Sequence, residues 1–465
     1  MKTGREDFVV KALFVSLWKD VILCSVLTLA TVVVAREPNY DEAKVAAYSL
    51  EDPLSFADGR KLASAAEWPL RRREIVKIFE REMYGRTPPA PETLVWEVLE
   101  EGPTLAGLAI RRQYRTWFVS DKTGPYVDWL VIIPNRIKQN DPRLKDGRVV
   151  CENTERVPVV LLLNYRGNHE LVTDPEVIIP DNIWVRNSAE FFCTDHRPSA
   201  KGRGLCRGTN VRAPFPLETI VARGYALITA CYGQVSPDAE VGKGDWEDMA
   251  YTGVFDLWPR RDPAATDNVT ALGAWAWALS RGLDLAFRIP EIDARRNVVT
   301  GCSRLAKAAL LAASRDERFA VCVPCQTGGG GCPLGKRDYG ENVSTMTSMF
   351  PHWYCRAYAK YADNERSQRF DQHLLIASIA PRAILVEGFN ESWFDTKGEY
   401  LACVAASPVW RFLGREGLKE ARFPSEYDTS CIGACLGYVR RGGAHGISGS
   451  DWQWMLDFAD RALKE

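Results

Sequence analysis

A serine lies where a run of β-branched residues gives way to a segment of good helix formers. Residues 298–307 have the sequence Val-Val-Thr-Gly-Cys-Ser-Arg-Leu-Ala-Lys, so Ser303 precedes helix-forming residues that extend from Arg304 to Ala313. A strand, a sharp turn, a serine and a helix are together typical of a nucleophile elbow, which exposes a hydroxyl for attack on an acyl carbon. The alternative is a serine that caps the helix, which is the commoner role of a serine at such a place.

A nucleophilic serine needs a base and a group that orients the base. The chain has five histidines, and His445 follows the last strand-like run, in the sequence Arg-Gly-Gly-Ala-His-Gly-Ile-Ser. A hydrolase with strands and helices in alternation carries its base on that loop. His445 is therefore the candidate base, although a histidine in a glycine-rich loop is, taken alone, more often incidental.

The orienting acid is expected after the penultimate strand-like run. Residues 383–395 have the sequence Ala-Ile-Leu-Val-Glu-Gly-Phe-Asn-Glu-Ser-Trp-Phe-Asp and offer Glu387, Glu391 and Asp395. Glu391 is the best placed because it lies several residues beyond the strand, whereas Asp395 has the alternative role of capping the next helix. The chain then presents serine, acid and histidine in the order found in α/β-hydrolases.

Two cationic side chains follow the serine closely. Arg304 comes directly after Ser303 and is expected to add positive charge to the oxyanion hole. Lys307 lies one helical turn further on the same face, where a cation suits a polyhydroxylated or anionic substrate. A solvent-facing lysine is the equally weighted alternative. A second donor of the oxyanion hole is expected at residues 161–169, where an apolar run passes into a glycine-containing loop.

Strand-like and helical patterns alternate along the chain. The strand-like runs are 126–133, 157–163, 225–230, 297–300, 319–323, 383–386 and 437–440, and the helical patterns include 68–85, 272–285, 304–314 and 397–413. This alternation favours a mostly parallel sheet with helices on both faces, whose functional residues gather at the carboxyl ends of the strands. The predicted fold class is α/β, an α/β-hydrolase fold with a mostly parallel central sheet flanked by helices in a three-layer sandwich. The irregular stretches near 170–215 and 326–375 are expected to form the walls of the site.

The composition fits one large folded domain. The 465 residues include 59 basic and 60 acidic side chains, and a net charge of −1 gives no electrostatic case for binding nucleic acid. No linker or internal repeat divides the chain, so residues 36–465 are expected to form a single esterase domain with an N-terminal helical extension. No cofactor is implied, and we expect a monomer.

An apolar segment precedes this domain. Residues 21–35 are uncharged and too short to span a bilayer comfortably. Val33 and Ala35 supply small residues at the cleavage positions, and Arg36 opens a polar stretch, which is typical of a secretory signal peptide. We expect export to the periplasm or the extracellular space with residues 1–35 removed; the alternative is a retained N-terminal anchor.

Export would place the cysteines in an oxidising compartment. Of the 13 cysteines, an even number remains once the segment with Cys24 is removed. A metal site is suggested by the cysteines at 322, 325 and 332, but no second Cys-x-x-Cys or histidine cluster accompanies them. We therefore expect disulfides or buried thiols and no metal.

Taken together, these residues resemble the glucuronoyl esterases, carbohydrate esterase family 15, from about residue 65 to the C-terminus. The resemblance rests on motifs that occur in order along the chain: Trp-Pro-Leu-Arg-Arg-Arg-Glu-Ile near 68–75, Leu-Asn-Tyr-Arg-Gly-Asn-His at 163–169, Cys-Tyr-Gly-Gln-Val-Ser-Pro-Asp at 231–238, Gly-Cys-Ser-Arg-Leu-Ala-Lys at 301–307, Phe-Pro-His-Trp-Tyr-Cys at 350–355, Ile-Ala-Pro-Arg-Ala at 379–383, Trp-Phe-Asp-Thr-Lys-Gly-Glu at 393–399, and His445 with Asp451-Trp452. One such motif alone is weak, whereas the ordered set is strong.

The resemblance implies hydrolysis of the ester that joins a (4-O-methyl)glucuronate of glucuronoxylan to a lignin alcohol, through a Ser-His-Glu triad and an acyl-enzyme. It implies Ser303 as nucleophile, His445 as general base and Arg304 as support for the oxyanion. The substrate-binding residues that it implies are Lys307, Trp393, Gln326 and Glu341. Among them, Lys307 would hold sugar hydroxyls and Trp393 would contact the uronate ring.

Three positions depart from the family pattern. Ala306 stands where the family usually has glycine, and its small side chain is expected to be tolerated. Gln326 stands where some members carry their acid, and because an amide cannot stabilise an imidazolium as a carboxylate does, Glu391 is the expected acid. Gly446 occupies the place of the cysteine to which fungal members tie the one before their serine, so Cys302 must pair elsewhere or stay free.

The leading hypothesis is thus a secreted serine esterase of glucuronoyl esters. An alternative on the same fold is an acetyl-xylan or other carbohydrate esterase, over which Lys307 and Trp393 favour the uronate. An alternative from another class is a carbohydrate-binding protein without catalysis, suggested by the departures above. The intact serine, acid and histidine speak against it.

Overall fold

The structure is a computed structural model that describes residues 37–135, 156–207, 215–390, 392–419 and 422–464. The chain divides into two units, Met1–Val34 and Ala35–Glu465. The first unit, with most of the predicted signal segment, lies outside the described residues, and so does Glu391. None of the described helices combines the length and the apolar composition that a membrane span requires.

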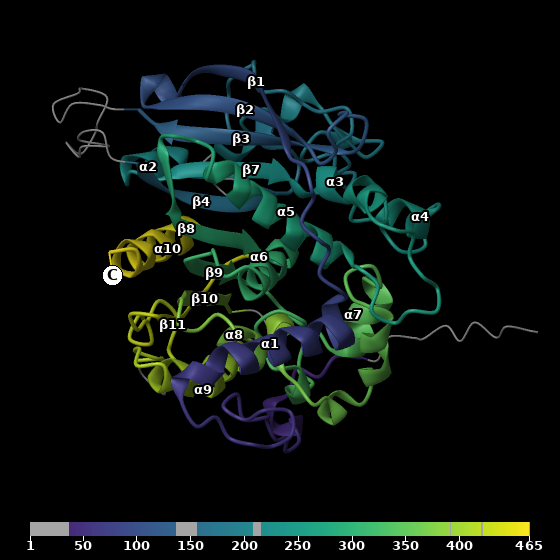
Figure 1. Cartoon of the computed structure of the whole chain (residues 1–465), viewed down its shortest axis with the longest axis vertical. Coiled ribbons are helices and arrows are strands. Elements are labelled where there is room, and N and C mark those ends of the chain that lie inside the picture. Colours follow the sequence, from purple (N-terminus) through teal and green to yellow (C-terminus); the bar gives the residue numbers. More distant parts are fainter. Residues whose placement is uncertain (1–36, 136–155, 208–214, 391, 420–421, 465) are drawn as a thin grey trace, which may run out of the picture. The chain divides into compact units, whose positions relative to one another are not determined.

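A nine-stranded sheet forms the centre of the second unit, in the order β1-β2-β3-β7-β4-β8-β9-β10-β11 (Figure 1). The strands are β1 (Val95–Thr104), β2 (Ala109–Trp117), β3 (Tyr126–Pro134), β4 (Val157–Asn164), β7 (Ala226–Cys231), β8 (Ile292–Cys302), β9 (Val321–Cys325), β10 (Ala383–Phe389) and β11 (Leu436–Arg441), and the short strands β5 (Cys193–Thr194) and β6 (Arg197–Pro198) form a separate pair. The strands from β7 to β11 pair in parallel, whereas β1, β2 and β3 pair antiparallel with their neighbours.

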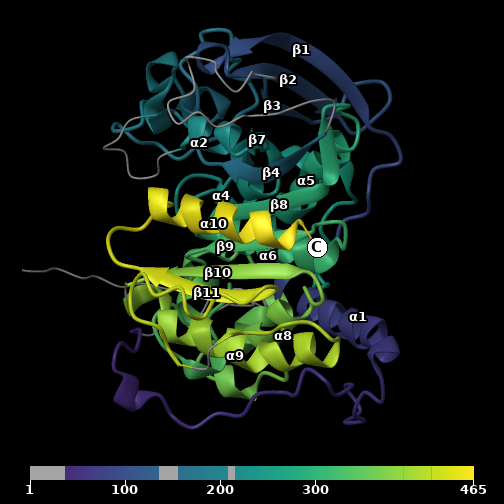
Figure 2. The same cartoon turned by 90° about the vertical axis from the view of Figure 1, so that its left-hand side faces the viewer.

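Helices cover both faces of the sheet, as the two views show (Figures 1 and 2). The helices are α1 (Trp68–Phe79), α2 (Leu217–Ala222), α3 (Tyr232–Val235), α4 (Trp246–Ala250), α5 (Ala271–Ala286), α6 (Arg304–Arg315), α7 (Val343–Met349), α8 (Gln372–Ala377), α9 (Thr396–Phe412) and α10 (Gly449–Ala462). Side chains of α2 and α10 pack in one hydrophobic cluster, and those of α1, α5, α6, α8 and α9 pack in another. This is the predicted α/β-hydrolase architecture of three layers.

The alternation of side chains along β4 explains the two layers. Leu161 packs into the cluster of α5 and α6, and Leu162 packs into the cluster of α2 and α10. Successive strand residues point to opposite faces. The continuous apolar run 157–163 is therefore a strand that is buried on both sides.

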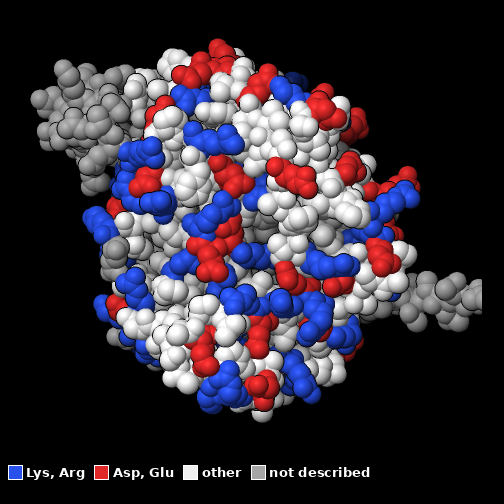
Figure 3. Space-filling view, in the orientation of Figure 1, with Lys and Arg blue, Asp and Glu red and all other residues white. Residues whose placement is uncertain are grey.

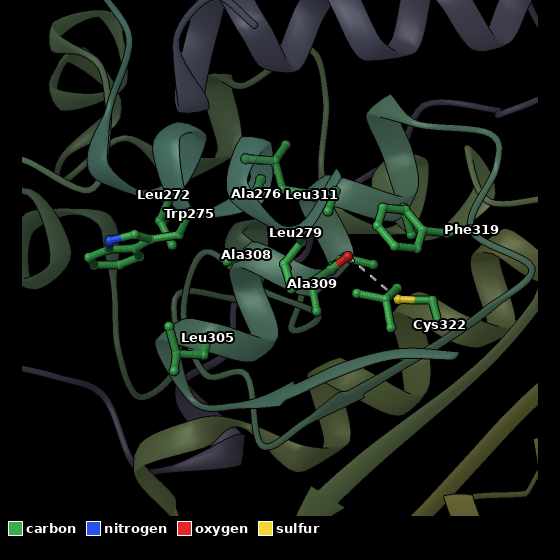
Figure 4. Packing of buried hydrophobic residues seen from close by; sticks show 14 of the residues in the cluster. Leu272, Trp275, Ala276, Leu279, Leu305, Ala308, Ala309, Leu311, Phe319 and Cys322 are labelled. Carbon is green, nitrogen blue, oxygen red and sulfur yellow. Dashed lines mark hydrogen bonds between the residues drawn. The ribbon is translucent and has the colours of Figure 1, made fainter. Parts of the chain in front are cut away.

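The helix that begins at the candidate nucleophile is anchored by its packing on α5 and β9 (Figure 4). Figure 4 labels Leu272, Trp275, Ala276 and Leu279 of α5, Leu305, Ala308, Ala309 and Leu311 of α6, and Phe319 and Cys322. Many of the α6 contacts are made by alanines, so the two helices approach closely. Burial of this face fixes the start of α6, and with it residue 303, relative to the sheet.

Every predicted strand-like run overlaps a strand, although the run 319–323 begins two residues before β9 and the run 225–230 begins one residue before β7. The helical pattern 68–85 is α1 followed by one π-helical turn, Glu80–Tyr84, and it ends at Gly85 with φ 75°. The antiparallel strands β1 and β2 have no counterpart among the predicted runs. The sheet is thus larger than expected on one side.

Of the eleven cysteines in the described part of the chain, all but Cys302 are buried, and nine are free thiols: Cys193, Cys206, Cys231, Cys302, Cys322, Cys325, Cys332, Cys355 and Cys403. The expectation of disulfides is therefore not met there, whereas the alternative of buried thiols is. Cys302 stays free.

Basic and acidic side chains are interspersed over the face of the molecule shown in Figure 3. This mixture agrees with the balanced formal charge of the sequence.

Candidate active site

Ser303 occupies a sharp turn between β8 and α6. Its backbone has φ 57° and ψ −127°, a combination that is strained for a residue with a side chain and is concentrated at functional sites. The Ser303 amide donates to the Cys325 carbonyl at 3.0 Å. The Ser303 side chain makes no capping hydrogen bond to α6. This geometry is that of a nucleophile elbow and differs from that of a helix cap.

The residues around the serine permit this turn. A Cβ atom on Gly301 would lie 2.5 Å from the Leu305 carbonyl oxygen, so only glycine lets α6 start this close to β8. Ala306 is fully buried, and its amide donates to the Ser303 carbonyl at 3.0 Å within the first turn of the helix. The methyl group that replaces the family's usual glycine is accommodated, as expected.

The loop after β4 lies against the elbow. The Tyr165 hydroxyl donates to the Cys302 carbonyl at 2.6 Å. Gly167 has φ 123°, and its amide donates to the Asn164 side chain at 2.8 Å. The segment that is expected to supply a second oxyanion donor is therefore fixed beside the residue that precedes the serine.

His445 follows β11 and is held by Gln326. The His445 Nδ1 atom lies 2.9 Å from Gln326 Oε1, and the Gly446 amide donates to the same oxygen at 2.8 Å. Gln326 Nε2 donates to the Gly446 carbonyl at 3.1 Å. Because the Gly446 N–H can only donate, it fixes the orientation of the amide, and Nδ1 must then carry the hydrogen. The tautomer that results leaves Nε2 of His445 as the basic nitrogen.

Gln326 contacts the candidate base. It is fully buried, and its amide group is engaged on three sides by the loop of His445. The resemblance groups Gln326 with the substrate-binding residues and also places it where some members carry their acid, and the contact with His445 agrees with the second of these.

Glu391, the predicted acid, lies outside the described residues. Its sequence neighbours Phe389 and Phe394 both contact the imidazole of His445, with ring centroids at 5.3 and 4.9 Å. Phe389 and Phe394 therefore both lie beside the candidate base. Asp395 accepts from the Gly398 amide at 2.9 Å and caps α9, which confirms its alternative role.

Arg304 extends from the first position of α6 to Asp238, with which it forms an ion pair. Its guanidinium carbon lies 4.9 Å from the ring centroid of Trp353. Burial alone would lower the pKa of Arg304, but the Asp238 carboxylate raises it, so the group is a permanent cation. Arg304 directly follows Ser303 in the chain.

Lys307, Glu341 and Trp393 meet one helical turn further along α6. The Lys307 side chain is 2% exposed, so it does not face solvent, and its Nζ lies 3.9 Å from Glu341 Oε2. Trp393 Nε1 donates to Glu341 Oε1 at 2.6 Å. Burial lowers the pKa of Lys307 and raises that of Glu341, and each opposes the shift of the other. Three of the predicted substrate-binding residues are thus brought together beside the elbow.

Known proteins of similar sequence and structure are esterases, in agreement with this geometry. Residues 224–414 match a family model described as fungal glucuronyl esterase. A promiscuous esterase of carbohydrate esterase family 15 from a marine bacterial metagenome superposes with a TM-score of 0.80 and 32% identity, over 92% of this chain and 100% of that one. The carbohydrate esterase MZ0003, from an unknown prokaryotic organism, is 33% identical over 429 residues, which are 91% of this chain and 92% of that protein. The chain belongs to carbohydrate esterase family 15.

Other members of family 15 agree with this assignment. A glucuronoyl esterase from Solibacter usitatus has a TM-score of 0.77 and 33% identity, over 91% of this chain and 100% of that one. A 4-O-methyl-glucuronoyl methylesterase from Podospora anserina is 25% identical over 379 residues, which are 79% of this chain and 61% of that enzyme. As a member of family 15, the chain is a carboxylic ester hydrolase.

Several residues of the site escaped sequence reasoning. Asp238 binds the guanidinium of Arg304, and Arg186, His352 and Trp353 bind the same carboxylate. Arg186 and the last two belong to the irregular stretches that were expected to form the walls of the site. Three of them also fall in motifs that carry the family resemblance, but no residue-level pattern assigned them a role.

Proposed function

We propose that this family 15 member is a serine esterase that cleaves the ester between a (4-O-methyl)glucuronate of glucuronoxylan and a lignin alcohol. The proposal is supported above all by the cluster of Lys307, Glu341 and Trp393 beside the strained serine. An ammonium group, a carboxylate and a partly exposed indole offer hydrogen bonds and an apolar face to a sugar ring. The names of the glucuronoyl esterase relatives support the same substrate class.

In the proposed reaction, the Ser303 hydroxyl attacks the uronate C6 carbonyl while His445 Nε2 takes its proton. The carbonyl oxygen becomes an oxyanion, which Arg304 and backbone donors stabilise. The intermediate then collapses: the bond to the alcohol oxygen breaks, and His445 returns the proton to the leaving alcohol. Water repeats these steps on the acyl-enzyme and releases the free uronate and the serine.

Glu391 is proposed as the acid that stabilises the imidazolium. Gln326 Oε1 can orient the ring through Nδ1, but an amide carries no charge with which to stabilise the positive form. The two phenylalanines that flank Glu391 in sequence and contact His445 support this assignment. Gln326 then orients the base, and Glu391 supplies the charge.

Export belongs to the same proposal. Xylan and lignin are polymers outside the cell, so an enzyme that acts on their linkage must leave it. Residues 21–35 have the composition of a signal peptide, which supports export through residues 1–35. Retention of this segment as an anchor is compatible with the same activity.

The test compares benzyl glucuronate with acetylated xylan, and includes p-nitrophenyl acetate as an ester without a sugar. We expect kcat/KM for the glucuronate to exceed that for xylan acetyl groups by about 100-fold or more. Lys307→Met should lower kcat/KM for the glucuronate by about 10–100-fold, because lost polar contacts to sugar hydroxyls cost roughly 1.5–3 kcal/mol. It should change the rate on p-nitrophenyl acetate by less than about threefold.

A preference for acetylated xylan would point to the acetyl esterase on the same fold. If Lys307→Met lowers kcat/KM equally for benzyl glucuronate and p-nitrophenyl acetate, Lys307 does not recognise the sugar. If the folded protein hydrolyses none of the three substrates, the remaining hypothesis is a carbohydrate-binding protein without catalysis.

A further inference from the structure

Asp238 is a buried carboxylate at the centre of the wall beside the elbow. It follows α3 at the carboxyl end of β7 and is 0% exposed. Its Oδ1 atom accepts from His352 Nε2 at 2.9 Å and from Trp353 Nε1 at 2.8 Å. Its Oδ2 atom pairs with Arg304 and, at 2.8 Å, with Arg186. A carboxylate buried this deeply is stable only because charged and polar donors surround it.

These donors come from distant parts of the chain. Arg186 lies in the loop before β5, Arg304 opens α6, and His352 and Trp353 follow α7. The Tyr232 hydroxyl adds a fifth donor at 3.3 Å. Asp238 therefore joins the two irregular walls of the site to the helix that starts at the nucleophile.

The same contacts restrict Arg304. One of its terminal nitrogens is bound by Asp238, and the plane of its guanidinium lies near Trp353, whose own N–H is bound by Asp238. Its Nε is buried and has no hydrogen-bond partner among the described residues. An unrestrained arginine side chain samples many rotamers, whereas an oxyanion is stabilised best by donors that are already in place.

The charges show why the carboxylate does not cancel the cation. One Asp238 carboxylate lies between two guanidiniums, so the group of Asp238, Arg186 and Arg304 keeps a net positive charge. Burial by itself raises the pKa of Asp238, but Arg304, His352 and Arg186 hold it well below its usual range. The Asp238 carboxylate is therefore ionised at neutral pH.

We infer that Asp238 is a positioning residue for the esterase reaction, which holds the Arg304 guanidinium in place for the oxyanion. The inference rests on the proposed function, in which Arg304 stabilises the oxyanion. It adds a residue that does not touch the substrate and acts through Arg304. Arg186 pairs with the same carboxylate, so the group of three side chains keeps a net positive charge.

A double-mutant cycle tests this role. Asp238→Asn should lower kcat by about 100-fold with KM changed less than about threefold, since one oxyanion donor contributes about 10²–10³ in kcat. In an Arg304→Gln background the same substitution should lower kcat by less than about threefold, because the group it positions is absent. Rates are divided by the number of sites counted by end-point fluorophosphonate titration, so that a misfolded fraction does not count as lost kcat.

A matched control and a milder variant accompany the cycle. Asp128 on β3 is 4% exposed and is bound by Arg115 at 2.7 and 2.9 Å. Asp128→Asn should lower the melting temperature and leave kcat per site unchanged. If Asp238→Asn fails to fold, Trp353→Phe removes one donor to Asp238 and keeps a ring. It should lower kcat by about three- to tenfold, and only where Arg304 is present.

An equal loss of kcat with and without Arg304, or wild-type kcat in Asp238→Asn, would overturn the inference. The cycle is measured on whichever ester the wild-type enzyme hydrolyses, because an oxyanion forms with any of them. If the enzyme hydrolyses acetyl esters but not glucuronates, the proposed substrate is wrong. The cycle on acetyl esters then still tests the role of Asp238.

Discussion

His445 meets an amide oxygen where a serine hydrolase triad has a carboxylate. Gln326 is bonded through both ends of its amide, so it holds the imidazole in one tautomer without charge. Orientation and charge stabilisation, which one carboxylate supplies together in the usual triad, are separable in this site. Single substitutions can therefore measure each contribution.

At the residue scale, we predict unequal losses for the two partners of His445. Glu391→Gln should lower kcat by about 10²–10⁴, as expected when the charge beside an imidazolium is lost. Gln326→Ala should cost about tenfold, because orientation alone is lost. In the Glu391→Gln background, Gln326→Glu should restore part of kcat, since it returns a carboxylate to Nδ1.

The kcat of Glu391→Gln, of Gln326→Ala and of the double variant is measured by steady-state kinetics on benzyl glucuronate. The melting temperature of each variant is the control for folding. Near-normal activity of Glu391→Gln beside an inactive Gln326→Ala would assign the essential contact to Gln326 and remove Glu391 from the triad.

At the scale of elements, the parallel half of the sheet could be predicted from the sequence, whereas its antiparallel edge could not. Runs such as 157–163 are apolar throughout because both of their faces are buried. By contrast, β1 and β2 are rich in charged residues and are joined by cross-strand pairs such as Arg111 with Glu100, at 2.9 Å. Hydrophobic periodicity cannot detect a strand such as β2, whose buried positions include charged and polar residues such as Arg111.

The elbow makes its own prediction at this scale. Gly301→Ala should destabilise the fold by about 2–3 kcal/mol and lower kcat by at least about tenfold, because its Cβ would press on the backbone at the start of α6. Ala306→Gly, only five residues away, should cost about 1 kcal/mol through helix propensity and leave kcat within about twofold. Thermal unfolding and kcat of the pair check this. Full activity in Gly301→Ala would show that the close approach of α6 and β8 is not needed.

At the scale of the whole molecule, the sequence predicts which stretches form the walls of the site. It does not predict which residues of these walls contact one another. The stretches near 170–215 and 326–375 supply Arg186, Glu341, His352 and Trp353. Their partners lie on other elements, so their roles depend on tertiary packing that no local pattern encodes. The nucleophile was easier to find, because strand, turn, serine and helix are adjacent in sequence.

The stability of the folded molecule should also depend on pH through Glu399. This side chain on α9 is fully buried, and burial raises its pKa from 4.5 to about 8, although Thr327 donates to it at 3.1 Å. Between these values the folded protein keeps a proton that the unfolded chain has lost, so stability falls as the pH rises from 4.5 to 8.

Glu399→Gln removes this titration. Relative to the wild type, its melting temperature should be nearly unchanged at about pH 5 and several degrees higher at about pH 8, which corresponds to roughly 2–4 kcal/mol. Calorimetry across this range makes the comparison. A difference that is constant with pH would mean that Glu399 does not titrate as its burial implies.

The covalent intermediate tests the central claim most directly. The wild-type enzyme is mixed with benzyl glucuronate and quenched in acid within milliseconds. The protein is then digested, and the masses of its peptides are measured by mass spectrometry. The account predicts a glucuronoyl adduct on the peptide that contains Ser303, and neither adduct nor turnover in Ser303→Ala. An adduct on another residue, or undiminished turnover by Ser303→Ala, would contradict it.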